Sequence, residues 1–160
     1  MRTVIYPGTF DPITNGHLDL ITRATVLFAR VIVAVAKNED KHPLFSHEER
    51  INLVKEAIKN LPQVEVTGFD GLLVDFVRKK RGQAVLRGLR AVSDFEFEFQ
   101  LALMNRKLDP NFETIFMMPN EEYTFLSSRM VKEIAKLGGN ISQFVPQHVS
   151  VALRKKLGFE

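Results

Sequence analysis

The first seventeen residues constrain the fold most, because they join a short apolar strand to an amphipathic helix through a turn rich in proline and glycine. Residues 3–6 predict a buried parallel strand, and Pro7-Gly8 is expected to end it. Apolar residues then recur at helical spacing over 20–28, so a helix should begin near Gly16. The free N–H groups and the positive dipole end of this helix would face the turn, where an anion can bind.

Apolar strand patterns alternate with helical patterns along the rest of the chain. Continuous apolar runs predict four further strands, near residues 31–35, 64–66, 84–86 and 114–118. Further helices are predicted near residues 46–61, 72–80, 93–107, 128–137 and 147–157. Continuous strands separated by helices indicate an α/β fold with a single doubly wound five-stranded parallel sheet and helices on both faces. We expect one domain over residues 1–160, a length typical of a single domain.

The segment 95–101 carries two conflicting patterns. Its strict alternation of phenylalanine and polar residues is typical of a strand. However, Ser93-x-x-Glu96 is a capping box, strong helix formers follow, and the stretch is long for a strand. We therefore expect a helix that is buried on several sides, partly against another subunit.

Composition and motifs exclude several classes of site. The chain has no cysteine, and its four histidines lack zinc-site spacing. It has neither the Walker-type loop nor the dinucleotide-binding glycine pattern. No signal peptide and no apolar run near the roughly 18 residues that span a bilayer are visible, so a cytoplasmic protein is expected. The basic run 78–81 is expected to end a helix that Gly82 caps, and not to bind nucleic acid, because no aromatic residue interleaves it.

Polar side chains follow most of the predicted strands. In chain order they are Thr9 and His17, then Lys41, then Arg87 and Arg90, and finally Ser127, Ser128 and Arg129. Because the carboxyl ends of parallel strands meet at one edge of the sheet, these groups should converge on one crevice. The sequence therefore predicts a polyphosphate site, although Lys41 alone is equally well read as a solvated loop charge. One of the two serines is also expected to cap its helix.

Three motifs carry a resemblance to a known family. Gly8-Thr9-Phe10-Asp11-Pro12 with Gly16-His17 is similar to the T/HxGH signature of nucleotidyltransferases. Together with Leu86-Arg87-Gly88-Leu89-Arg90 and the stretch 125–133, it resembles the bacterial phosphopantetheine adenylyltransferases over nearly the whole chain. The resemblance implies a Rossmann-like fold and adenylyl transfer from ATP to 4′-phosphopantetheine, which gives dephospho-coenzyme A and pyrophosphate in coenzyme A synthesis.

The same resemblance implies roles for individual residues. His17 and Lys41 are the expected catalytic residues. The expected ATP-binding residues are Thr9, Phe10, His17, Gly88, Leu89, Arg90, Glu98, Tyr123, Thr124, Phe125, Leu126, Ser127, Ser128 and Arg129. The expected phosphopantetheine-binding residues are Thr9, Lys41, Leu73 and Arg87. Many relatives carry a small residue where Arg129 stands, so the role of Arg129 is the least firmly implied.

The resemblance further implies Mg²⁺ bound with ATP, a homohexamer and feedback inhibition by coenzyme A. No carboxylate cluster suggests a protein ligand to the metal, and Asp11 is expected to shape the turn before Pro12. Two alternatives stay open at this stage. One is another small nucleotidyltransferase with a different acceptor, such as a cytidylyltransferase or a nicotinate-nucleotide adenylyltransferase. The other is a non-catalytic nucleotide-binding module.

Overall fold

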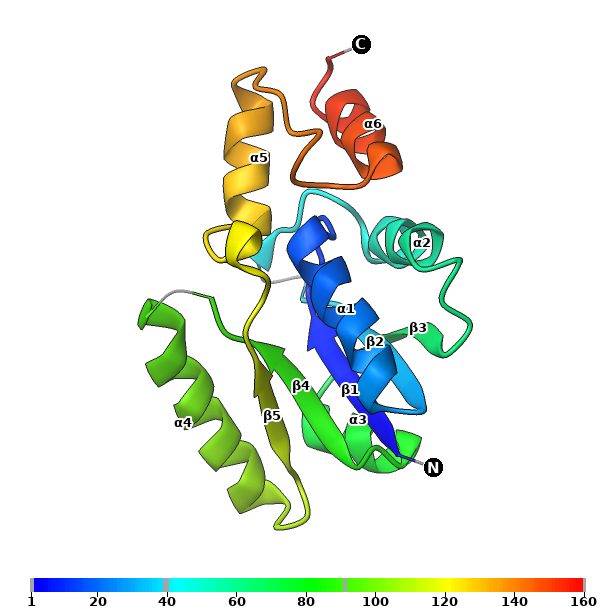
Figure 1. Cartoon of the computed structure of the whole chain (residues 1–160), viewed down its shortest axis with the longest axis vertical. Helices are drawn as coiled ribbons and strands as arrows, with labels where there is room; N and C mark the ends of the chain where they lie inside the picture. Colours follow the sequence, from blue (N-terminus) through cyan, green and yellow to red (C-terminus); the bar gives the residue numbers. More distant parts are fainter. Residues whose placement is uncertain (1, 39–40, 91, 160) are drawn as a thin grey trace.

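A five-stranded parallel sheet forms the centre of the molecule (Figure 1). The computed structural model describes residues 2–38, 41–90 and 92–159, without the side chains of 92–94. Its strands are β1 (Thr3–Gly8), β2 (Arg30–Ala36), β3 (Val64–Phe69), β4 (Ala84–Gly88) and β5 (Thr114–Met117). They lie in the order β3-β2-β1-β4-β5, and each of these pairings is parallel. The strand order reverses between β1 and β4, where a doubly wound sheet opens a crevice.

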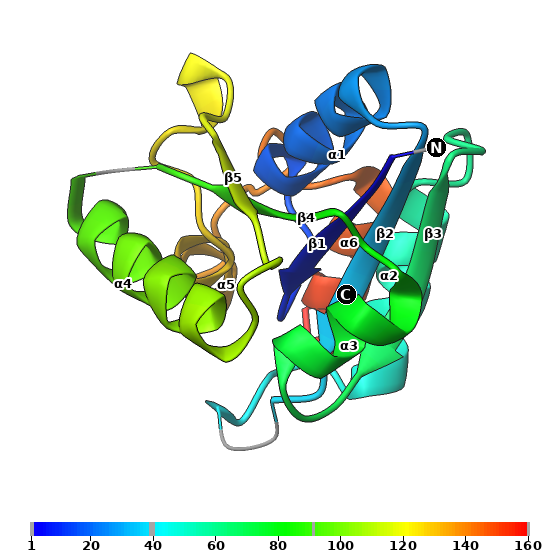
Figure 2. The same ribbon diagram turned by 90° about the horizontal axis from the view of Figure 1, so that it is seen from below.

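Helices cover both faces of the sheet, as predicted. They are α1 (Asn15–Leu27), α2 (His47–Ala57), α3 (Leu73–Lys80), α4 (Val92–Leu108), α5 (Ser128–Lys136) and α6 (Gln147–Lys156), with a short 3₁₀ turn η2 (Glu121–Tyr123). Figure 2 shows α1 and α3 on opposite sides of the strands. The helix predicted over 93–107 is confirmed, while the cap predicted at Ser93 lies outside the described side chains. Over the described part of the chain, no helix is both long and apolar enough to cross a membrane.

Successive residues of β1 point to opposite faces and build two hydrophobic cores. Val4 and Tyr6 belong to the larger core, which lies against α1, α2, α5 and α6. Ile5 belongs to the smaller core, with Val74 and Val77 of α3. Burying an aliphatic side chain fully contributes about 1.5–3 kcal/mol, so packing on both sides fixes the sheet between its helices. The carboxyl ends of the strands are thereby held in one place.

Strand β1 runs two residues further than the sequence predicts. Pro7 and Gly8 continue it because they pair with Ala34 and Val35 of β2. Toward β4, the Pro7 carbonyl accepts a hydrogen bond from the side chain of Arg87 (3.2 Å) and no strand ladder continues there. The N–H and C=O of one strand residue point to the same side of the strand. The N–H that Pro7 lacks would therefore point toward β4, where the ladder has ended, and no ladder hydrogen bond is lost.

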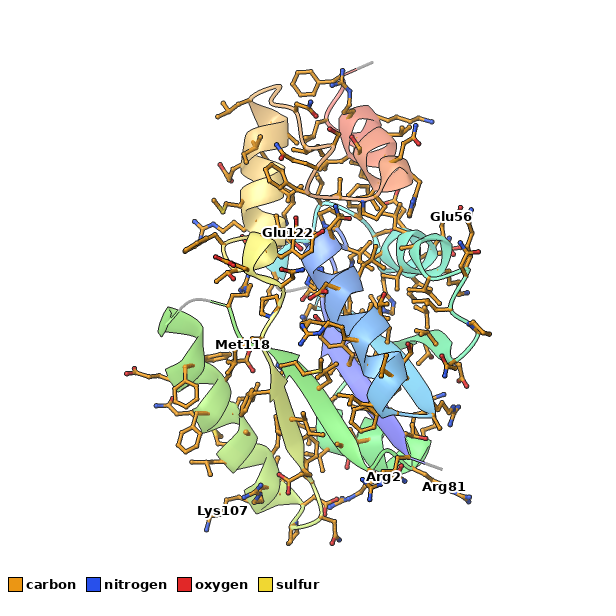
Figure 3. The ribbon with its side chains drawn as sticks, viewed as in Figure 1. Arg2, Glu56, Arg81, Lys107, Met118 and Glu122 are labelled. Atoms are coloured by element: carbon orange, nitrogen blue, oxygen red, sulfur yellow. The ribbon has the colours of Figure 1, made fainter. Side chains whose placement is uncertain are left out.

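The basic run at the end of α3 lies far from the carboxyl edge of the sheet. Figure 3 shows Arg81 beside Arg2, at the end of the sheet where the strands begin. The predicted glycine cap is wrong, because Arg81 and not Gly82 adopts the left-handed conformation (φ 54°). Gly82 is required for packing instead, since a Cβ there would lie 2.9 Å from the Ile5 side chain.

Candidate active site

Two adjoining hollows open at the carboxyl ends of the strands. The α5-side hollow, about 460 Å³, is lined by the turn after β1, the start of α1, the end of β4 and the segment leading into α5. The β3-side hollow, about 480 Å³, is lined by residues that follow β1, β2 and β3. The two hollows share Pro7, Gly8, Thr9, Lys41 and Arg87. The predicted convergence of polar groups at one edge is therefore present.

Most of the predicted site residues line these hollows. The α5-side hollow is lined by Thr9, Phe10, His17, Lys41, Arg87, Gly88, Arg90, Glu98, Tyr123, Leu126, Ser127, Ser128 and Arg129. Leu73, the first residue of α3, lines the β3-side hollow. Leu89, Thr124 and Phe125 are among the lining residues of neither, and the Phe125 side chain points to solvent, with 79% of its surface exposed.

His17 is held by the cap of α1. Thr14 is the N-cap residue, and its backbone N–H donates a hydrogen bond to Nδ1 of His17 (3.0 Å). Because Nδ1 accepts this bond, the proton of the neutral ring is on Nε2. The ring of Phe10 packs edge-on against the imidazole, with 5.0 Å between ring centroids. The side chain that lines the cleft is therefore fixed in orientation and in tautomer.

The surroundings of His17 favour its neutral form. Burial is the main cause that lowers the pKa of the imidazole to about 4, and the positive charges of Arg90 and Arg87 contribute to the same shift. At neutral pH the ring is therefore uncharged and presents one N–H donor. Such a group can donate a hydrogen bond to an anionic oxygen but has no proton-accepting nitrogen left toward the cleft.

Arg87 ends β4 at the junction of the two hollows. Its Nε donates to Oε2 of Glu98 (2.7 Å) and its Nη2 to Oε1 (2.5 Å), so the two side chains form a two-point ion pair. Glu98 is on α4 and is buried. From the sequence pattern alone, Glu98 is one more carboxylate on the surface of a helix. In the structure, its ion pair with Arg87 fixes the plane of the guanidinium at the site.

Two residues that the sequence analysis missed hold Thr9. The side chain of Asn38 donates a hydrogen bond to the Thr9 hydroxyl (2.8 Å). Arg50 of α2, which is fully buried, donates to the backbone carbonyls of Thr9, Phe45, Ala36 and Lys37. Arg50 thus ties together the segments that follow β1 and β2. Burial lowers its pKa from the ordinary arginine value, and the nearby Asp11 carboxylate opposes that shift.

The start of α5 is attached to the turn after β1. Ser127 is the N-cap, and its hydroxyl accepts a hydrogen bond from the Met130 N–H (3.1 Å), which confirms that one of the two serines caps the helix. The hydroxyl of Ser128 donates to the Pro12 carbonyl (2.6 Å). Arg90 donates to the Leu126 carbonyl (3.2 Å). The backbone N–H groups at this helix start therefore border a cleft that already contains arginines.

Asp11 does more than shape the turn, so that expectation was incomplete. Its carboxylate accepts hydrogen bonds from the backbone N–H groups of Leu44 and Phe45 (both 2.9 Å) and from Nζ of Lys132 (2.7 Å). The side chain of Asp11 is buried, and Lys132 lines the cleft. A residue that forms such contacts across the fold cannot be distinguished from a turn former by its local sequence.

The cleft is strongly cationic. Five basic side chains, of lysine or arginine, line the α5-side hollow, namely Lys41, Arg87, Arg90, Arg129 and Lys132. Its two carboxylates, Asp11 and Glu98, are each bound to one of these cations. Within the described ranges, no group of three or more His, Asp or Glu side chains could hold a metal ion. The excess of positive charge suits a polyphosphate, whose oxygens could themselves bring a divalent cation.

Comparisons with known proteins agree with this geometry. The cytidylyltransferase-like family matches residues 5–134. A phosphopantetheine adenylyltransferase of Methylococcus capsulatus is 59% identical over 154 residues, which are 96% of this chain and 95% of that protein. One of Azoarcus sp. is 56% identical over 153 residues, 96% of this chain and 94% of that protein. The crystal structure of a bifunctional NMN adenylyltransferase/ADP ribose pyrophosphatase from Francisella tularensis shares the fold, with 16% identity and a TM-score of 0.75 over 99% of this chain and 50% of that one.

Proposed function

The chain belongs to the phosphopantetheine adenylyltransferase family, whose members transfer an adenylyl group in coenzyme A synthesis, and from this premise we propose how its cleft performs the reaction. ATP occupies the α5-side hollow and 4′-phosphopantetheine the β3-side hollow. The observation that carries this assignment is the overlap of the two hollows at Thr9, Lys41 and Arg87. These are three of the four residues expected to bind the acceptor, and two substrates that react must meet where their sites adjoin.

The reaction is an in-line displacement at the α-phosphorus of ATP. An oxygen of the acceptor phosphate forms a new bond to the α-phosphorus, the bond from the α-phosphorus to the bridging oxygen breaks, and pyrophosphate leaves with those electrons. The nucleophile is already anionic at neutral pH, so no general base is needed. Bringing two anions together is the main difficulty, and catalysis therefore depends on positioning and electrostatic stabilisation.

Each cationic or polar group of the cleft has a part in this scheme. Nε2–H of His17 donates to an α-phosphate oxygen, where charge develops in the transition state. Lys41 bridges the nucleophile and the α-phosphate, and Arg87 holds the acceptor phosphate. The β- and γ-phosphates bind Arg90 and the N–H groups at the start of α5, with Ser128 beside them. Leu73 contacts the apolar pantetheine arm.

Mg²⁺ accompanies the triphosphate in this proposal. The ion prefers phosphate oxygens and water, so the chain need not supply a ligand cluster. When bound, it supplies charge neutralisation on the phosphates. The two carboxylates of the cleft are already engaged by Arg87 and Lys132, which supports the expectation of no direct protein ligand.

We also propose that the chain acts as one nucleotidyltransferase domain and assembles as a homohexamer in the cytoplasm. Exposed apolar side chains on two sides of α4 support assembly; they are Phe95, Phe99 and Leu103 on one side and Phe97, Met104 and Leu108 on the other. Large apolar side chains exposed in such number are typical of a protein interface. Inhibition by coenzyme A is proposed because that molecule contains both the pantetheine arm and an adenine nucleotide, and the two adjoining hollows could receive these parts together.

Pyrophosphate release on mixing ATP with 4′-phosphopantetheine tests the function. Turnover with this acceptor, and none with unphosphorylated pantetheine, is the expected result. Turnover only with other phosphorylated acceptors would assign the chain to a different nucleotidyltransferase activity. Binding of ATP without pyrophosphate release in the presence of any acceptor would show that the chain is a non-catalytic nucleotide-binding module.

A further inference from the structure

A polar cluster in the wall of the cleft contacts no substrate in the scheme above. It consists of the Asp11 carboxylate, the Lys132 ammonium and the backbone N–H groups of Leu44 and Phe45. The side chain of Asp11 is 5% exposed and that of Lys132 is 23% exposed. Charged groups this deeply placed are costly unless each is paired and hydrogen-bonded, and here they are.

The cluster joins three segments that carry proposed site residues. Asp11 follows Thr9 and Phe10 in the turn after β1. Leu44 lies three residues after Lys41, and Lys132 lies one helical turn after Ser128 on α5. The carboxylate of Asp11 therefore connects the segment bearing Lys41 to the helix whose start borders the triphosphate end of the cleft.

The chemistry of the cluster explains why both side chains are needed. One carboxylate oxygen accepts from Phe45, and the other accepts from both Leu44 and Lys132. Hydrogen bonds of an ionised group are stronger than neutral ones, and removing one partner from a buried charge is expensive because the remaining charge is undercompensated. Loss of the ammonium would therefore weaken the hold of Asp11 on the two amides.

We propose that Lys132 and Asp11 are a positioning pair, through which α5 fixes the segment carrying Lys41 in register with the triphosphate end of the cleft. This role rests on the proposed function and deepens it. Lys132 acts on the carboxylate and not on a substrate phosphate. A displacement of Lys41 of about 1 Å is enough to cost about 100-fold in rate.

The test uses Lys132→Met in the full chain, with Lys132→Arg as the conservative variant. Lys136→Met is the matched control, since Lys136 lies one turn further along α5 and is exposed. Hydrogen exchange of the Leu44 and Phe45 amides, followed by NMR without substrate, reports on the contact itself. Steady-state kinetics then give kcat and the two KM values.

In Lys132→Met we expect both amides to exchange at least tenfold faster, and kcat to fall about 10–100-fold with KM for ATP changed less than twofold. Lys132→Arg should restore most of the loss, and Lys136→Met should match the wild type. Combining Lys132→Met with Asp11→Asn should lower kcat no further than Lys132→Met alone.

Unchanged amide exchange in a folded Lys132→Met protein would overturn the proposal. A selective rise in KM for ATP with protected amides would overturn it too, because it would make Lys132 a direct phosphate ligand. The exchange measurement needs no turnover. Failure of the wild type to release pyrophosphate would therefore reject the proposed function, while the exchange data would still decide whether Lys132 acts on the two amides through Asp11.

Discussion

Glu98 binds Arg87 at two points, at the place where the two hollows of the cleft meet. The pair spans α4 and the end of β4, so a helix on the flank of the sheet sets the orientation of a guanidinium in the site. A half-buried arginine held in this way keeps its planar donor arrangement without a bound substrate, which lowers the cost of organising the site when a phosphate arrives.

Replacing Arg87 by lysine should therefore weaken acceptor binding although the charge is kept. A lysine cannot reproduce the planar fork, and one charge-assisted hydrogen bond is worth about 1.5–3 kcal/mol. We expect Arg87→Lys to raise KM for 4′-phosphopantetheine about 10–100-fold, with KM for ATP changed by less than about threefold. The control is Arg30→Lys, since Arg30 forms a similar two-point pair with Glu65 on the surface. If Arg87→Lys had the same KM as the wild type for each substrate, the result would contradict the role of Arg87 in binding the acceptor phosphate.

Removing the imidazole of His17 should lower kcat about 10²–10³-fold, the usual effect of losing one donor to a developing charge. Because His17→Ala also removes half of a capping box, thermal unfolding must be measured beside the kinetics. Ser46→Ala is the matched control, since it removes a capping side chain from α2 and should cost about 1 kcal/mol of stability without lowering kcat. A folded His17→Ala enzyme with near-normal turnover would refute the role of His17.

The lowered pKa of His17 predicts a pH dependence of stability. The folded-state pKa of about 4 lies below the ordinary value of 6.5, so the unfolded chain binds more protons between these pH values. The contribution of neutral His17 to stability is therefore complete above pH 6.5 and is lost as the pH falls toward 4, by on the order of 3 kcal/mol. Urea unfolding of wild type and His17→Gln at several pH values measures it, since the difference between the two proteins cancels the titrating carboxylates. A difference that does not change between pH 7 and 4.5 would exclude the predicted shift.

Arg50 should be essential for stability although its side chain lines neither hollow. Arg50→Met leaves four backbone carbonyls without their donor, and each buried unpaired acceptor costs about 1–3 kcal/mol. We expect the free energy of unfolding to fall by at least about 3 kcal/mol in a urea titration. Lys55→Met, at an exposed position of the same helix, should change it by less than about 0.5 kcal/mol. A loss below 1 kcal/mol in Arg50→Met would show that water replaces the guanidinium.

A charge at an exposed apolar position of α4 should prevent assembly. Phe97 is 64% exposed, and an interface that covers it would have to bury the carboxylate of Phe97→Glu without a partner. Light scattering coupled to size-exclusion chromatography should show a smaller species than the wild type. Val26→Glu, at an exposed apolar position on α1, serves as the control and should leave the mass unchanged. An unaltered hexamer in Phe97→Glu would place the interface elsewhere.

The strands, the helices and the convergence of the cleft were predictable because they follow from local pattern and from the geometry of parallel sheets. Val31 to Val35 is a continuous apolar run, and in a doubly wound sheet its end must meet the ends of its neighbours. The sequence alone was therefore enough to assign Thr9, His17 and Arg87 to one crevice.

Contacts between distant segments were not predictable in this way. Arg50 sits between Glu49 and Ile51 on an amphipathic helix, where a solvated arginine is the ordinary expectation. Asp11 precedes a proline, and that context alone explains an aspartate. Both are buried because partners about 30 to 120 residues away satisfy their charges or hydrogen bonds. No periodicity in a single sequence reports such a pairing.

Because the two hollows overlap only in part, acceptor binding and nucleotide binding involve largely different residues. Residues that follow β3, including Leu73, border only the acceptor side, while the start of α5 borders only the nucleotide side. Re-engineering the catalyst for a different phosphorylated acceptor thus calls for exchanging the loop between β3 and α3, with the adenylyl-donating machinery left untouched.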